Sequence, residues 1–127
     1  MAIRGIRGAT TAPANTREAI LTATRELLDA LIRANQIHPA DVASIYFTAT
    51  PDLDAAFPAA AAREMGWTDI ALLDAQAPRV PNDLARCIRV LIHWNTDRPH
   101  DALRHVYLRD ASRLRPDWAT RVSLVNE

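Results

Sequence analysis

The hydrophobic and polar positions of the chain change period along its length, and each change predicts a different element. Between residues 16 and 35, apolar side chains recur at three- and four-residue spacing, which predicts an amphipathic helix. Asn15, followed three residues later by Glu18, has the form of a capping box and is the expected N-cap. A shorter helix is expected from Pro58 to a stop at Gly66, because proline suits the first turn and glycine the C-terminal end.

Five further stretches predict strands, most of them rich in β-branched residues. They cover residues 2–12, 42–50, 70–73, 86–94 and 105–108. Asp74 is expected to close the third strand, a loop is expected over 75–83, and one helical turn is expected at 101–104. The tail of about 116–127 is expected to be flexible.

Strands that alternate with helices indicate an α/β (α+β) fold, and the length suits a single domain over residues 1–127. One long and one short helix are too few to cover both faces of a sheet of about five strands. We therefore expect a partner subunit on the uncovered face.

Composition excludes several function classes. Hydrophobic residues make up 49% of the chain, which argues against disorder, and the formal net charge of zero argues against a nucleic-acid or anionic-membrane binder. No apolar run is long enough for a leader or a membrane span, and a single cysteine, Cys87, allows no internal disulfide, so a cytoplasmic setting is expected. The four histidines lack metal-ligand spacing, and no nucleotide-binding or nucleophile motif occurs, so no metal and no cofactor are expected.

All 15 basic residues are arginines, so any bound anion must be met by guanidinium groups. Arg89 lies in the middle of the apolar strand CIRVLIHW, where a charged side chain is costly unless it is paired. Two interpretations stay open at this point. Arg89 either pairs with a structural carboxylate from a neighbouring strand or awaits an anionic ligand.

Other candidate residues are less specific. Arg7 lies between Gly5 and Gly8 in the first strand, which indicates either a close approach of ligand or backbone, or a surface arginine. Tyr107 is expected in the core or at an interface, and its hydroxyl needs a partner if it is buried. Arg63 and Arg115, taken singly, suit solvated surface positions. Together these residues indicate an arginine-rich site for a small anion without identifying it.

Four separated motifs carry a resemblance to a known family: IRGIRGATT at 3–11, ATPDLDAAFPAAAAR at 49–63, CIRVLIHWNTDRP at 87–99 and RHVYLRDASRLRPD at 104–117. In this order the chain resembles the monofunctional chorismate mutases of the small, trimeric, pseudo-α/β-barrel bacterial class. The resemblance implies a mixed five-stranded sheet and a homotrimer with active sites between subunits. It also implies an isomerase that converts chorismate to prephenate in phenylalanine and tyrosine biosynthesis, without a cofactor.

The resemblance also assigns roles to individual residues. Arg7, Arg89 and Tyr107 fall on substrate-binding positions, and Arg89 would be the fixed cation beside the ether oxygen whose bond breaks. Phe57 and Arg63 fall on positions contributed by the adjacent subunit, and Leu73 is also expected to bind substrate. Leu114 and Arg115 fall on the C-terminal segment that closes over the cleft.

The chain departs from the family pattern at three positions. Ala77 stands where a glutamate usually binds the substrate's ring hydroxyl, Asp74 stands where a cysteine is usual, and Ala60 replaces a basic residue. The hypothesis is that Asp74 supplies the missing carboxylate and also balances the charge of Arg89. Two alternatives remain: a trimeric imine or enamine deaminase-like enzyme, and a non-catalytic binding protein for an aromatic-pathway metabolite.

Overall fold

The computed structural model describes residues 1–116, and the expected flexibility of 117–127 lies outside the described residues. The strands are β1 (Ile3–Thr11), β2 (Val42–Ala49), β3 (Ala71–Gln76), β4 (Cys87–Asn95) and β5 (Val106–Tyr107). The α-helices are α1 (Arg17–Asn35) and α2 (Ala59–Glu64). Short 3-10 helices span Pro39–Asp41, His100–Ala102 and Arg109–Arg113.

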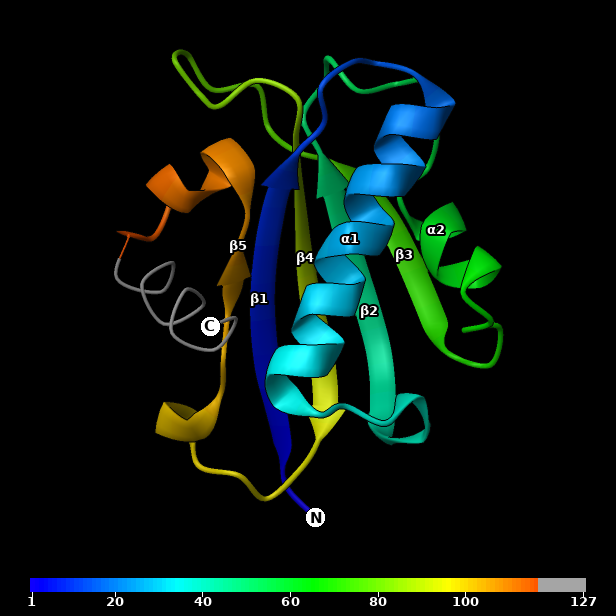
Figure 1. The fold of residues 1–127 in the computed structure, drawn as a ribbon, viewed down its shortest axis with the longest axis vertical. Helices are drawn as coiled ribbons and strands as arrows, with labels where there is room; N and C mark the ends of the chain where they lie inside the picture. Colours follow the sequence, from blue (N-terminus) through cyan, green and yellow to red (C-terminus); the bar gives the residue numbers. More distant parts are fainter. Residues whose placement is uncertain (117–127) are drawn as a thin grey trace.

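The five strands form one mixed sheet in the order β3-β2-β4-β1-β5, which confirms the predicted fold class (Figure 1). The central strand β4 pairs antiparallel with both β1 and β2, whereas β3 and β5 are added in parallel at the edges. Because β4 is hydrogen-bonded along both sides, its backbone is held in place by two neighbouring strands. The points from which its side chains extend are therefore fixed by the sheet.

The helix α1 runs across one face of the sheet, and α2 lies on the same side next to β3 (Figure 1). Gly8 of β1 allows this packing, since a Cβ added there would lie 2.9 Å from Leu31 Cδ1 and 3.2 Å from Leu27 Cδ1 of α1. The close approach that glycine in the first strand suggested is therefore made by this helix. The main core lies between the sheet and α1 and contains Ile6, Leu27, Leu31, Phe47, Val90 and Ile92.

The other sheet face, called the open face below, lies away from α1 and α2. Side-chain alternation places three exposed apolar residues on it: Ile3, Tyr46 and Leu73, which are 54%, 42% and 57% exposed. Among the described residues no helix is long and apolar enough to cross a membrane. The same part of the chain contains no group of three metal-ligating side chains.

Two predicted boundaries are wrong. The N-cap of α1 is Thr16, whose hydroxyl accepts the Ala19 N–H at 3.1 Å, rather than Asn15. The third strand does not end at Asp74 but continues to Gln76, because β2 offers a parallel partner as far as Ala49. Smaller shifts affect the predicted strand at 105–108, which is reduced to β5, and the turn at 101–104, which begins at residue 100.

Candidate active site

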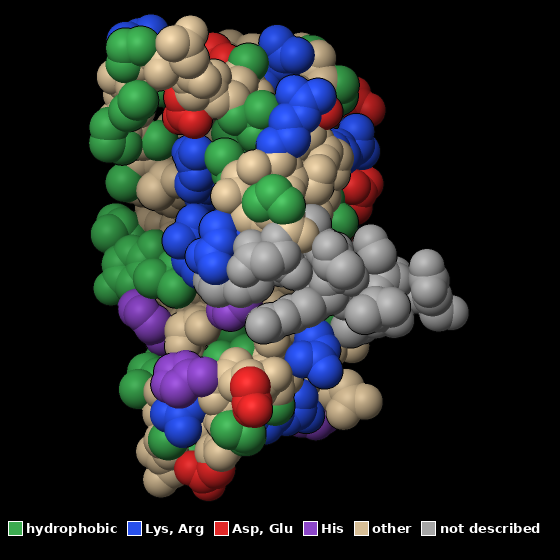
Figure 2. Space-filling model, turned by 90° about the vertical axis from the view of Figure 1, so that its left-hand side faces the viewer, with side chains coloured by type: hydrophobic (Ala, Val, Ile, Leu, Met, Phe, Trp, Pro, Cys, Tyr) green, Lys and Arg blue, Asp and Glu red, His purple; other side chains and the backbone are tan. Residues whose placement is uncertain are grey.

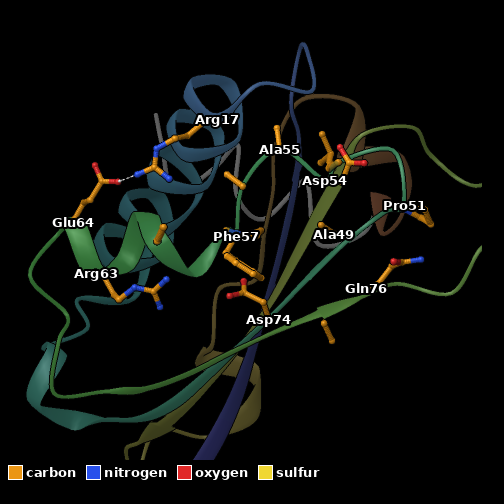
Figure 3. A pocket seen from close by; sticks show the side chains of 15 residues that line it. Arg17, Ala49, Pro51, Asp54, Ala55, Phe57, Arg63, Glu64, Asp74 and Gln76 are labelled. Carbon is orange, nitrogen blue, oxygen red and sulfur yellow. Dashed lines mark hydrogen bonds and ion pairs between the residues drawn. The ribbon is translucent and has the colours of Figure 1, made fainter.

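One cavity, of about 720 Å³, lies on the helix-covered side of the sheet, between the loop that precedes α2, α2 itself and β3. Three of the predicted site residues line it: Phe57, Arg63 and Asp74 (Figure 3). We call these three residues the α2 half-site. Ala60, where the family usually has a basic residue, also lines this cavity.

The carboxylate of Asp74 is held at the start of α2. Asp74 pairs with Phe47 in the β2–β3 register, so its side chain projects to the helix-covered side. There its Oδ1 accepts the backbone N–H of Ala59, the first residue of α2, at 2.9 Å. Burial raises the pKa of Asp74, while the Ala59 hydrogen bond and the positive charge of Arg63 act in the opposite direction. Asp74 is thus a partly desolvated carboxyl group that faces the cavity.

The other members of the α2 half-site come from α2 and the loop before it. Arg63 lies in the last turn of α2, and Figure 3 shows its side chain extending from the helix towards the side on which Asp74 lies. Phe57 is 68% exposed, which is unusual for a phenylalanine and leaves its ring available to a ligand or a partner. The helix ends at Glu64, and Gly66, two residues later, has a φ of 92°, a conformation that favours glycine.

Asn15, predicted as an N-cap, instead holds the loop that forms one wall of this cavity. Its side-chain Nδ2 donates to Asp54 Oδ1 at 2.7 Å, and its Oδ1 accepts the N–H groups of Asp54 and Ala55, both at 3.1 Å. Asn15 therefore satisfies two loop N–H groups rather than helix N–H groups. This supporting role was missed because it depends on a contact 39 residues away in the chain.

The second cavity, about 550 Å³, lies at the end of the sheet where β3 leads into the following loop. Arg89 lines it together with Ala77 and Asp83, and Gln76 lines both cavities. Arg89 Nη2 lies 3.3 Å from Asp83 Oδ1, and the two side chains are only 22% and 24% exposed. The carboxylate expected beside Arg89 is therefore present, but it comes from a loop rather than from a neighbouring strand.

Arg7 and Tyr107 lie on the same face as Arg89. Ala9 of β1 is opposite Arg89 on one side and opposite Tyr107 on the other, and Arg7 is two residues before Ala9 on the same face. The small Ala9 thus lies between the larger side chains. Tyr107 is buried against Ala9 and Cys87, as expected for a core or interface tyrosine. We call Arg7, Arg89 and Tyr107 the strand half-site.

The remaining predicted residues lie around these groups. Leu73 is on the open face opposite Tyr46, and Leu114 packs against the cluster around Ala9 and Tyr107. Arg115 is exposed near the end of the described chain. Figure 2, which views the molecule from the β5 edge, shows basic side chains lying next to a group of hydrophobic ones on this side of the protein.

The structure corrects one part of the sequence hypothesis. Thr48 pairs with both Arg89 and Ala75, so Arg89 shares the open face with Ala75 and not with Asp74. Asp74 and Arg89 therefore project from opposite faces of the sheet, and within one protomer Asp74 does not balance the charge of Arg89. That charge is met by Asp83, which the sequence reasoning missed. The available signal was that Asp83 is the one acidic residue between positions 75 and 96.

A mixed sheet with helices on one side, and arginines that line two separate cavities, places the protein among small sheet-and-helix proteins whose cavities suit an anionic ligand. Comparison with known proteins gives the family. The chain matches the family model for chorismate mutase type I over residues 3–118, and it belongs to that family.

Individual relatives agree with this assignment. The chain is 54% identical to a chorismate mutase of Thermus thermophilus over 116 residues, which cover 91% of this chain and 95% of the relative. It is 48% identical to a chorismate mutase of Bacillus subtilis, with 92% and 93% covered. Among solved structures, a chorismate mutase from Clostridium thermocellum superposes with a TM-score of 0.85 at 47% identity, covering 87% of this chain and 98% of that one.

Proposed function

We propose that the chain converts chorismate to prephenate, for phenylalanine and tyrosine biosynthesis, in active sites that are each assembled from two protomers of a homotrimer. The observation that carries the shared site is the division of the candidate residues between two faces of one sheet. Arg89 and Arg63 line different cavities, and a sheet separates them. One protomer cannot enclose a small substrate with both groups, whereas the strand half-site of one protomer and the α2 half-site of its neighbour can.

The open face supports an assembly of this kind. Its exposed Ile3, Tyr46 and Leu73 form part of an apolar surface that water would otherwise contact. Three protomers that turn these faces towards a common axis would bury this surface. Closed cyclic symmetry then gives three identical clefts between neighbouring protomers.

The reaction suits the chemistry of the strand half-site. Chorismate carries two carboxylates, and an intramolecular rearrangement needs no nucleophile from the protein. As the ether bond breaks, negative charge develops on its oxygen, and a fixed cation there stabilises the transition state more than the ground state. Arg89, held by the doubly paired β4, supplies this cation. Arg7 and Tyr107 bind the enolpyruvyl carboxylate and favour the compact conformer that reacts.

Asp74 supplies the acceptor for the ring hydroxyl of the substrate. It thereby takes the role of the glutamate that the family usually has at the position of Ala77. Its carboxylate already accepts one hydrogen bond from Ala59 and has a second oxygen that faces the cavity of the α2 half-site. Because Asp74 and Arg89 lie on opposite faces, this role requires Asp74 of one protomer to meet Arg89 of the next. The proposed role of Asp74 therefore depends on the same trimer as the proposed shared site.

Loss of the diene absorbance of chorismate by the purified protein tests the activity, and light scattering should give three times the protomer mass of 14.1 kDa. Chorismate turnover with that mass is the expected result. Ammonia release from an enamine without chorismate turnover would favour a deaminase. Chorismate binding without turnover would favour a binding protein, and a monomeric mass at full activity would contradict the shared site.

A further inference from the structure

The neighbours of Arg89 in the sheet leave its side chain room to move. The residues opposite it are Ala9 on β1 and Thr48 on β2, both small. A long guanidinium side chain between small neighbours has several accessible rotamers, and a group that stabilises a transition state must keep one position. The contact that fixes the guanidinium is therefore important for the reaction. In this structure that contact is with Asp83 Oδ1, at 3.3 Å.

Asp83 is itself held in place by its own loop. Its backbone N–H donates to the Val80 carbonyl at 3.2 Å, and its Oδ1 accepts the Leu84 N–H at 2.8 Å. Asn82, immediately before it, has a φ of 63°, which turns the chain at this point. The side chain of Leu84 packs against the buried cluster that includes Tyr107. The carboxylate is thus held in place by contacts with Val80, before Asp83 in the chain, and with Leu84, after it.

The far end of the loop is anchored as well. The Arg86 N–H donates to Asp52 Oδ2 at 2.8 Å, and its Nε donates to the Ala12 carbonyl at 3.0 Å. Ala12 in turn donates its N–H to the Arg86 carbonyl at 2.9 Å. These bonds join the loop to the ends of β1 and β2. Because the loop is tied to the sheet at Arg86, the position of Asp83 relative to the backbone of Arg89 on β4 is constrained by the sheet.

We propose that Asp83 is a positioning residue that fixes the guanidinium of Arg89 for the rearrangement, a role that rests on the proposed chorismate mutase function. A guanidinium has five N–H donors in a planar fork, and the contact with Asp83 leaves donors free for the substrate. Ala77, in the same cavity, offers no acceptor in its side chain. Among the described residues that line this cavity, Asp83 is therefore the acidic partner of Arg89.

The proposal predicts a specific kinetic pattern. Asp83→Ala frees the guanidinium and removes a negative charge from an anion-binding site, so kcat should fall about tenfold or more, while KM stays the same or decreases. Asp83→Asn keeps an oxygen acceptor for the guanidinium and should stay within about threefold of the wild-type kcat, since a hydrogen bond is weakened rather than lost. Damage to the loop alone would raise KM and would not be rescued by asparagine.

Steady-state chorismate turnover by the full chain, with thermal unfolding measured in parallel, tests this role. Asp69→Ala is the matched control, because Asp69 is an exposed aspartate in the turn before β3. A wild-type kcat for Asp83→Ala would overturn the proposal, as would an equal loss of kcat in Asp83→Ala and Asp83→Asn at unchanged thermal stability. Absence of turnover by the wild-type protein would instead reject the proposed function.

Discussion

The two half-sites are built from different elements, and under the proposed function the difference suits them to different tasks. Arg89 extends from β4, which is hydrogen-bonded to a strand on each side, and its guanidinium contacts Asp83. Arg63 extends from the six-residue helix α2 at the edge of the molecule. A cation that stabilises developing charge must be fixed before the reaction, whereas a cation that attracts a carboxylate can adapt during binding. The strand half-site therefore suits catalysis, and the α2 half-site suits binding.

The acidic residues show the same division. Asp83 pairs directly with an arginine, whereas Asp74 is partly buried, with its pKa raised by desolvation and only partly lowered again by the Ala59 N–H and the charge of Arg63. A carboxylate that is already paired is suited to hold its partner in place. One that is incompletely satisfied is suited to accept a hydrogen bond from a ligand. Four predictions follow from this contrast between the half-sites, beginning with the largest expected effect.

Arg89→Lys should lower kcat by about a hundred- to a thousandfold, the range seen when one fixed donor to a developing oxyanion is lost. Lysine keeps the charge but loses the planar fork and the contact geometry with Asp83. Chorismate turnover measures the effect, and unfolding of the variant should occur close to the wild-type temperature. A kcat within a few-fold of the wild type would mean that the strand half-site does not carry the electrostatic role.

Asp74→Ala should lower kcat/KM by about ten- to a hundredfold, the loss expected for one charge-assisted hydrogen bond. Asp74→Asn should lose less, since its amide oxygen can still accept from Ala59 and from a ring hydroxyl. The same turnover assay applies to both variants, with Asp69→Ala as the control. Near-wild-type kcat/KM in both Asp74 variants would eliminate Asp74 as the substitute for the missing glutamate.

Gly8→Ala should destabilise the protein by about 1–3 kcal/mol, the usual cost of overpacking, because the added methyl group would lie 2.9 Å from Leu31 Cδ1. Gly5→Ala on the open face is the matched comparison, since its Cβ would meet only Leu91 Cδ1, at an ordinary 3.4 Å. Denaturant unfolding compares the two variants. Equal destabilisation would show that the open face is packed as tightly in the assembled protein as the helix-covered face.

The smallest effect concerns pH. Since the pKa of Asp74 is raised in the folded state, the folded protein binds this proton more tightly than the unfolded chain does. Its contribution to stability therefore falls as the pH rises from the ordinary value of 3.8 through the raised value. The stability difference between wild type and Asp74→Asn should change in this window by less than about 1 kcal/mol, because the group is partly exposed. An opposite slope would show that Arg63 and Ala59 dominate over burial.

Hydrophobic periodicity was enough to predict most of the fold. The long helix, the second helix before Gly66 and the strand around Arg89 all lie close to their predicted positions. The wrong boundaries occur where the local sequence allows two equally good solutions and contacts with distant parts of the chain decide between them. Asn15 and Thr16 are both good N-caps, and the loop at 54–55 binds Asn15, which leaves Thr16 to cap the helix. These contacts have no signature in the local sequence.

The site was predicted as a list of residues but not as an arrangement. Alternation along β4 correctly placed Arg89 apart from the buried Val90. It could not show that Asp74 lies on the opposite face, because that depends on the register between β2 and β3. Alternation also could not show that the side chain of Asp83 contacts Arg89, because the path of the loop depends on its anchoring through Arg86.

The central claim is that each active site combines the strand half-site of one protomer with the α2 half-site of another. Co-expression of Arg89→Ala and Arg63→Ala chains, each impaired alone and each carrying a different tag, tests it most directly. Purified mixed trimers, which contain both kinds of chain, should regain activity in about a third of their sites, since a closed ring of three with either composition has one interface that pairs two intact halves. Mixed oligomers no more active than the two variants measured separately would contradict the shared site.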